Sequence, residues 1–137
     1  MQDFRNLSVW QMARKLTKSM YTVTAGFPIS EEFGLKAQMR RATVSICANI
    51  AEGCGRGGDP EFRKYLRIAM GSACELECET ILSFDLGFVT EAVQDQILVS
   101  VREIKRMLSG LIQRLSPKNP GAGKPTTARR PADRAAL

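Results

Sequence analysis

The chain contains no histidine among its 137 residues and only one tryptophan. Histidine is the commonest general base in enzymes and the commonest metal ligand, so its absence removes most familiar catalytic and metal-centre chemistry. It also excludes the Glu-x-x-His pairs by which helical bundles hold two irons. We therefore expect a protein with no enzymatic activity and no cofactor.

Long apolar runs are also missing. No stretch free of charge approaches the roughly 20 apolar residues that a membrane span requires, and Met1-Gln2-Asp3-Phe4-Arg5 carries an acid and leads into no apolar run. A secretory signal has the opposite composition. The sequence therefore predicts a cytoplasmic protein without a membrane partner, whose four cysteines stay reduced.

No Cys-x-x-Cys pair occurs, although Cys74 and Cys78 are four residues apart and share a helical face. Without histidine, a zinc site would need these two thiolates to converge with Cys47 and Cys54. Reduced cysteine more often packs as a small apolar side chain. We expect no metal site.

The net charge of +6 is concentrated at the C-terminal end. Residues 117–137 hold five bases and one acid, whereas the remaining residues carry 15 bases and 13 acids. The body of the protein is therefore close to neutral, and the tail adds a weak electrostatic attraction for anions.

Four segments carry apolar residues at helical spacing, and none shows the alternation of a strand. Ser30 and Thr90 are candidate N-caps, Asp59-Pro60 is a typical helix start, and Gly53 is a candidate helix stop. The predicted helices span residues 7–24, 31–52, 59–87 and 90–115. Short connections favour an all-α, up-down-up-down antiparallel four-helix bundle over residues 1–116. Residues 117–137 form a basic tail rich in Pro, Gly and Ala, predicted to be disordered.

The third predicted helix has apolar residues over more than half of its circumference. Beside its core-facing stripe lies a second stripe of Met70, Cys74, Cys78 and Ile81. A helix in a lone four-helix bundle needs an apolar arc of only about 100°. The second stripe is thus either a subunit interface of a homo-oligomer or part of a wide core contact.

Glu77 lies between the two apolar stripes of this helix. A carboxylate beside an apolar seam is costly unless it is paired, and arginine is its best partner. We expect Arg41 or Arg40 to pair with Glu77, within or between subunits. The alternative is that the Glu77 side chain bends toward solvent.

Residues 53–58 match the Gly-x-Gly-x-x-Gly pattern of dinucleotide-binding loops. That fingerprint requires a strand before the loop, and here a helix precedes it. The segment is better interpreted as a helix stop and a turn. Arg56, together with the N-terminus of the next helix, could still contact a phosphate of nucleic acid.

Several motifs resemble one bacterial family. In the first two predicted helices they are Leu7-Ser8-Val9-Trp10-Gln11-Met12-Ala13, Phe33-Gly34-Leu35, residues 38–46, and Asn49-Ile50-Ala51-Glu52-Gly53 with Arg56 after it. In the third predicted helix they are Phe62, Tyr65-Leu66, Ala69, Gly71-Ser72 and Glu75-Leu76-Glu77. Over residues 4–115 the chain resembles the four-helix-bundle proteins encoded in intervening sequences of 23S ribosomal RNA genes. The resemblance implies a homo-oligomer, a ring of five bundles. Relatives of that family include the accessory variability determinant of diversity-generating retroelements, which engages reverse transcriptase and nucleic acid.

Two functions follow from these patterns. The first is a homo-oligomeric nucleic-acid or ribonucleoprotein accessory factor that binds RNA or DNA, or a protein such as a reverse transcriptase. Its candidate contacts are Lys36, Arg40, Arg41, Arg56, Arg63, Lys64 and Arg67. The second is a protein-interaction scaffold with no nucleic-acid role. The relatives carry strongly basic surfaces, and the near-neutral body of this chain departs from that pattern.

Overall fold

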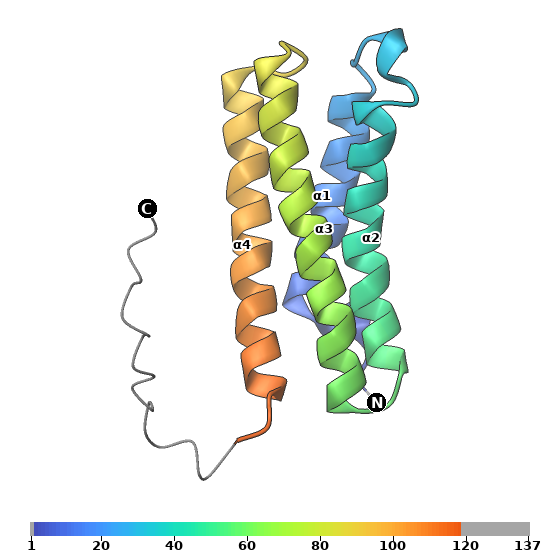
Figure 1. Cartoon of the computed structure of the whole chain (residues 1–137), viewed down its shortest axis with the longest axis vertical. Coiled ribbons are helices and arrows are strands. Elements are labelled where there is room, and N and C mark those ends of the chain that lie inside the picture. Colours follow the sequence, from blue (N-terminus) through green and yellow to red (C-terminus); the bar gives the residue numbers. More distant parts are fainter. Residues whose placement is uncertain (1, 119–137) are drawn as a thin grey trace, which may run out of the picture.

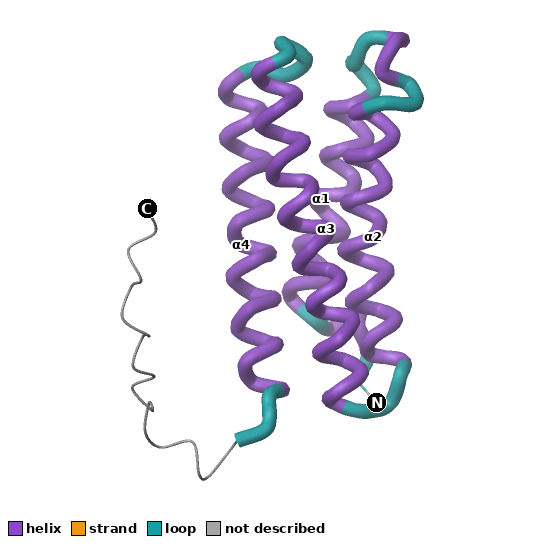
Figure 2. The backbone as a smooth tube through the Cα atoms, in the orientation of Figure 1, coloured by secondary structure: helices purple, strands orange, loops and turns teal. Residues whose placement is uncertain are grey.

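The computed structural model describes residues 2–118, and most of that range is α-helical (Figure 1). The helices are α1 (Ser8–Thr24), α2 (Leu35–Gly55), α3 (Asp59–Asp85) and α4 (Glu91–Leu115), with short 3-10 turns η1 (Phe4–Asn6) and η2 (Ile29–Glu31). Figure 2 shows no strand in this part of the chain. Beyond Lys118 the predicted tail lies outside the described residues.

The helices form an antiparallel bundle in which each contacts its neighbours in chain order, and α4 also packs against α1. The α1–α2 and α3–α4 connections lie at one end of the bundle, and the α2–α3 turn lies at the other (Figure 1). This confirms the predicted all-α four-helix bundle. None of the helices within residues 2–118 is long and apolar enough to cross a membrane.

The core is built from one apolar seam on each helix, as the spacing predicted. Burial of these side chains away from water is the main force that holds the bundle together. The seams are Val9, Ala13, Leu16 and Met20 on α1; Met39, Ala42, Ile46 and Ile50 on α2; Phe62, Leu66, Ala69, Ala73 and Leu76 on α3; and Ile97, Val101, Ile104 and Leu108 on α4.

The start of α2 differs from the prediction. The helix begins at Leu35, four residues later than expected, and Ser30 does not cap it. Instead, the Oε2 atom of Glu31 accepts a hydrogen bond of 3.0 Å from the backbone N–H of Leu35. The carboxylate thereby satisfies one of the free N–H groups at the helix start, which an upstream acid can do from a preceding turn.

The end of α2 also differs, because Gly53 does not stop the helix. It is buried inside α2, and a Cβ atom there would lie 2.8 Å from Phe62 Cδ2 and 2.9 Å from Tyr65 Cβ on α3. Gly53 is therefore a point of close helix–helix approach. The turn itself uses Gly57, whose φ of +77° lies in the left-handed region that favours glycine.

The remaining start signals are mostly correct. Pro60 lies in the first turn of α3, but no side chain caps that helix. Thr90 does cap α4, because its Oγ1 atom accepts a hydrogen bond of 3.2 Å from Val93 N–H.

Candidate functional site

The seven predicted nucleic-acid contacts do not form one surface. Lys36, Arg40 and Arg41 lie in the first half of α2, near the end that carries the α1–α2 connection. The other four lie near the α2–α3 turn, at the opposite end: Arg56, Arg63, Lys64 and Arg67. At 1.5 Å per residue, Arg41 and Arg56 are separated by about 22 Å along the axis of α2.

Three of these cations, on α2 or at its C-terminal end, are held by contacts within the chain. Lys36 pairs with Glu32 at 2.8 Å, and Arg56 pairs with Glu52 at 2.7 Å. Arg40 donates hydrogen bonds to Thr24 Oγ1 at 2.8 Å and to the Tyr21 carbonyl oxygen at 3.0 Å. Arg40 thus anchors α2 to the C-terminal turn of α1, where a cation is favourable.

The cations of α3 are less engaged. Arg63 donates a hydrogen bond to the carbonyl oxygen of Leu115 at the end of α4. Lys64 and Arg67 are exposed, and the Lys64 ammonium lies 5.6 Å from the centre of the Tyr65 ring. These two, with Arg41 on α2, are the exposed members of the predicted set that form no ion pair within residues 2–118.

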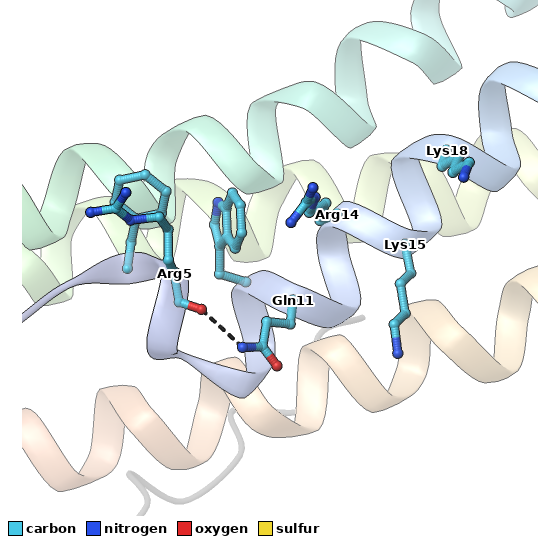
Figure 3. Close-up of a pocket in the computed structure, with 7 residues that line it drawn as sticks. Arg5, Gln11, Arg14, Lys15 and Lys18 are labelled. Carbon is cyan, nitrogen blue, oxygen red and sulfur yellow. Dashed lines mark hydrogen bonds between the residues drawn. The ribbon is translucent and has the colours of Figure 1, made fainter.

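The structure draws attention to α1, which the sequence-based prediction passed over. This helix carries Arg14, Lys15 and Lys18 and has no acidic residue. Arg5, in the turn before α1, approaches the same face, and its carbonyl oxygen accepts a hydrogen bond of 2.9 Å from Gln11 Nε2 (Figure 3). Arg5 also pairs with Asp3 at 2.9 Å, but none of the ion pairs within residues 2–118 involves the three cations of α1 itself.

A groove runs between α1 and α2 beside these cations. From α1 it is lined by Trp10, Arg14, Thr17, Lys18, Tyr21 and Thr22, and from α2 by Val44 and Cys47. Trp10, Arg14, Thr17 and Tyr21 follow one another at intervals of four, three and four residues, which places them on one side of the helix. Figure 3 shows Arg14 and Lys18 on the side of α1 nearer α2, whereas Lys15 points toward α4. The groove has a volume of about 760 Å³, and we call it the α1–α2 groove.

The aromatic rings of the α1–α2 groove are braced by their neighbours. The Phe4 and Trp10 rings meet edge to face with centroids 4.9 Å apart, and the Arg14 guanidinium lies 5.6 Å from the Trp10 ring centre. The guanidinium of Arg40 lies 4.3 Å from the centre of the Tyr21 ring. Contacts of both kinds favour fixed ring positions.

The floor of the groove is weakly polar. Thr17 Oγ1 donates to the Ala13 carbonyl oxygen at 2.8 Å and lies 3.5 Å from Cys47 Sγ. Burial raises the pKa of the Cys47 thiol, which keeps it neutral and unreactive. The arrangement offers flat apolar surface between cations, which suits an anionic ligand that has planar groups.

Within the chain, Glu77 does not pair with Arg41 or Arg40. It faces α4 instead, 3.4 Å from Arg102 Nε and 3.5 Å from Lys105 Nζ. The expected ion pair is wrong for a single subunit because Glu77 lies on the side of α3 away from α2. A pairing between subunits stays a prediction.

The buried acid of α3 is Glu79, which the sequence-based prediction did not single out. Its side chain faces α2, the residue is 4% exposed, and neither carboxylate oxygen has a hydrogen-bond partner. The pKa of Glu79 is raised to about 8, chiefly by burial and also by the nearby Glu75 carboxylate, while Arg41 opposes the rise. Two carboxylates cannot donate to each other, so a proton on one of them is what makes the pair stable.

The other predicted residues are placed as follows. Met70 is partly buried against the core, whereas Cys74, Cys78 and Ile81 are exposed on α3. All four cysteines are free, with Cys54 buried and Cys47 partly buried on α2. Over residues 2–118, no three Cys, Asp or Glu side chains gather as a metal site requires.

Comparison with known families gives a direct result. The family model for 23S rRNA-intervening sequence proteins matches residues 5–110. The chain belongs to this family. Membership in the 23S rRNA-intervening sequence proteins confirms the resemblance identified from the motifs, and the match runs from η1 into the last turns of α4.

The fold is shared with a solved structure from Bacteroides thetaiotaomicron, a protein of unknown function from the S23 ribosomal protein family. The two chains are 24% identical, the match covers 77% of this chain and 95% of that one, and the TM-score is 0.72. At this identity the likeness shows the fold alone. Among curated proteins, none matches this member of the 23S rRNA-intervening sequence family.

The groove could have been found partly from the sequence. The absence of acids in residues 8–24 and the spacing of Trp10, Arg14 and Tyr21 are both readable there. What the sequence does not show is that Val44 and Cys47 of α2 complete the opposite wall.

Proposed function

We propose that this chain is a non-enzymatic, homo-oligomeric accessory protein that binds RNA or DNA through the cationic face of α1. The observation that carries the proposal is the α1–α2 groove, where Arg14 and Lys18 stand beside exposed aromatic surface and no acid lines the walls. The adjoining hollow adds Lys15, and also Arg5, whose guanidinium is paired with Asp3. Cations such as Arg14, Lys15 and Lys18, which form no ion pair within residues 2–118, attract a polyanion more strongly than cations already paired.

The contacts expected on this surface are phosphates. Each phosphate neutralised by Lys or Arg releases condensed counterions, so affinity falls steeply as salt rises. The paired cations Lys36 and Arg56 would have to give up a carboxylate partner before contacting phosphate, and they contribute less. We therefore expect the unpaired cations of α1 to contribute more to phosphate binding than the paired cations Lys36 and Arg56.

The test compares two double variants that lose the same charge. Arg14→Gln with Lys18→Gln removes the cations of the groove, and Lys64→Gln with Arg67→Gln removes two exposed cations of α3. We expect the pure protein to retard structured RNA or DNA at about 50 mM salt, and the first variant to reduce the slope of log affinity against log salt by about 2. The second variant should change that slope little. Equal effects of the two variants would place the contacts elsewhere, and no retardation of any nucleic acid would refute the function.

Self-association is supported by apolar surface left open on α3. Cys74, Cys78 and Ile81 are exposed, although they lie beside the core-facing stripe. Apolar residues grouped in this way commonly mark an interface. We expect a species heavier than one 15.1 kDa chain in sedimentation at micromolar concentration. The proposal includes the cytoplasm as the compartment, since all four cysteines are free thiols.

One observation favours the alternative of a protein-interaction scaffold. In the α1–α2 connection, Ile29 and Phe33 are 91% and 93% exposed. At the same end of the bundle, Leu82 and Leu86 of the α3 region are also exposed (Figure 1). A partner protein recovered through this end, together with no affinity for nucleic acid, would favour the scaffold.

A further inference from the structure

We infer that the α1–α2 groove takes single-stranded nucleic acid, with bases stacked on Trp10 and Tyr21 and the backbone held by Arg14 and Lys18. This inference rests on the proposed nucleic-acid function and specifies the form of ligand that the site selects. It stands on the placement of two rings and two cations in one groove that is lined by no acid.

The spacing of the rings fits a short run of nucleotides. Trp10 and Tyr21 are eleven residues apart on α1, which corresponds to about 16 Å along the helix axis. Stacked nucleotides advance about 3.4 Å each along one strand, so about five of them span the two rings. Arg14 and Lys18 lie between the rings in the same stretch, where the phosphates of that run would pass.

The position of the rings selects against a duplex. They sit beside a trough between two neighbouring helices, whose axes are typically only about 8–10 Å apart. A duplex turns its bases inward and offers phosphates and groove edges, so it would touch only the cationic rim. A single strand can splay its bases onto aromatic faces, and such stacking tolerates any sequence because every base has a flat face.

Both rings are held as platforms. Arg40 covers one face of Tyr21, and its hydrogen bonds to Thr24 and to the Tyr21 carbonyl keep it there, while the residue remains 45% exposed. Phe4 braces Trp10 edge-on. The Arg14 guanidinium over Trp10 pairs with no acid, so a phosphate beside the groove can draw it off the indole and open the ring face to a base.

The experiment uses the intrinsic fluorescence of the full-length protein, because Trp10 is the only tryptophan of the chain. The protein is titrated at about 50 mM salt with an oligothymidine of fifteen nucleotides and, separately, with a fifteen-base-pair duplex. We expect the single strand to quench Trp10 emission at saturation and to bind at least tenfold more tightly than the duplex. The duplex should bind without comparable quenching.

A matched pair of variants tests the second ring. Tyr21→Leu removes a stacking surface and should weaken oligothymidine binding about 5- to 150-fold while changing duplex binding little. Phe33→Leu removes an aromatic ring that is even more exposed but lies outside the groove, and it should have no effect. Circular dichroism on both variants checks that the helices are intact.

The outcomes separate this inference from the proposed function. If neither ligand binds, both ideas fail. If single strand and duplex bind equally well and Trp10 emission does not change, the nucleic-acid function stands and base stacking in the groove is refuted. An emission change that follows protein concentration instead of added oligonucleotide also refutes the inference, because it would show that a second copy of the chain occupies the groove.

Discussion

Glu79 is the residue whose environment conflicts most with its chemistry. It is buried against α2 with both carboxylate oxygens unsatisfied. An ionised carboxylate without a partner in such a place is costly, so the folded chain holds a proton there well above the ordinary pKa of 4.5. The free energy of unfolding therefore depends on pH through Glu79.

Replacing Glu79 by Gln should remove this dependence. Between the ordinary pKa of 4.5 and the folded pKa of about 8, the folded chain keeps a proton that the unfolded chain releases. The free energy of unfolding of the wild type therefore falls as pH rises through this window, and the contribution is lost above pH 8. The neutral amide of E79Q does not titrate, so the difference in free energy of unfolding between E79Q and wild type should shift in favour of E79Q by up to about 4 kcal/mol from pH 5 to pH 9. Urea unfolding at several pH values measures the difference.

Glu103→Gln is the control for this experiment. Its hydrogen-bonded partner Arg106 lowers the pKa of the partly exposed Glu103, so that residue titrates below the window. The stability curve of E103Q should run parallel to that of wild type from pH 5 to pH 9. If the E79Q curve does the same, Glu79 does not hold the proton.

The sequence alone does not single out Glu79. On a helical wheel Glu79 lies about 120° from Ala73, and Ala73 is at the centre of the core stripe. A side chain so far from the centre of the stripe is usually solvated. It is buried only because α2 packs closely over that side of α3. Glu77, nearer to the core stripe on the same wheel, escapes burial by reaching Arg102 and Lys105 on α4.

Among the helices, α2 and α3 approach each other most tightly beside Gly53. A Cβ atom there would lie within 3 Å of both Phe62 and Tyr65. Gly53→Ala should therefore lower the free energy of unfolding by about 1–3 kcal/mol through overpacking, even though alanine is the better helix former. Gly71→Ala is the matched control: nothing lies within 4 Å of its Cβ position, so it should raise stability by about 0.5–1 kcal/mol. Thermal or urea unfolding checks both, and a stabilising G53A would contradict the close approach.

The helices themselves are the part of the fold that local pattern predicts well. Apolar spacing is a property of neighbouring residues, so the seams on all four helices are found from the sequence. The helix boundaries depend on contacts that spacing does not contain. Glu31 caps α2 from a separate turn, and Gly53 is small because α3 passes over it. The α1–α2 groove also depends on contacts between helices that spacing does not contain, because Val44 and Cys47 complete it from α2.

Charge is unevenly distributed over the whole molecule. From residue 68 to residue 101 the chain holds six acids and neither lysine nor arginine. This segment makes up the second half of α3, its connection to α4 and the first part of α4. The α3–α4 connection in this segment lies at the same end of the bundle as the α1–α2 connection, which carries the exposed Ile29 and Phe33 (Figure 1). A polyanion is repelled from this acidic and apolar end, which leaves it available for protein contacts.

The apolar stripe on α3 lies within this acidic segment, and a charge introduced there tests whether it is an interface between copies. Ile81 is 39% exposed, so Ile81→Arg should leave the fold intact while placing a cation in any contact made by the stripe. An unpaired charge buried in an interface is strongly unfavourable, so the variant should sediment as a single chain of 15.1 kDa while wild type does not. Val99 on α4 is 69% exposed, and Val99→Arg provides an equal charge outside the stripe that should leave the assembly unchanged. If I81R and V99R both sediment like wild type, the copies meet through another face.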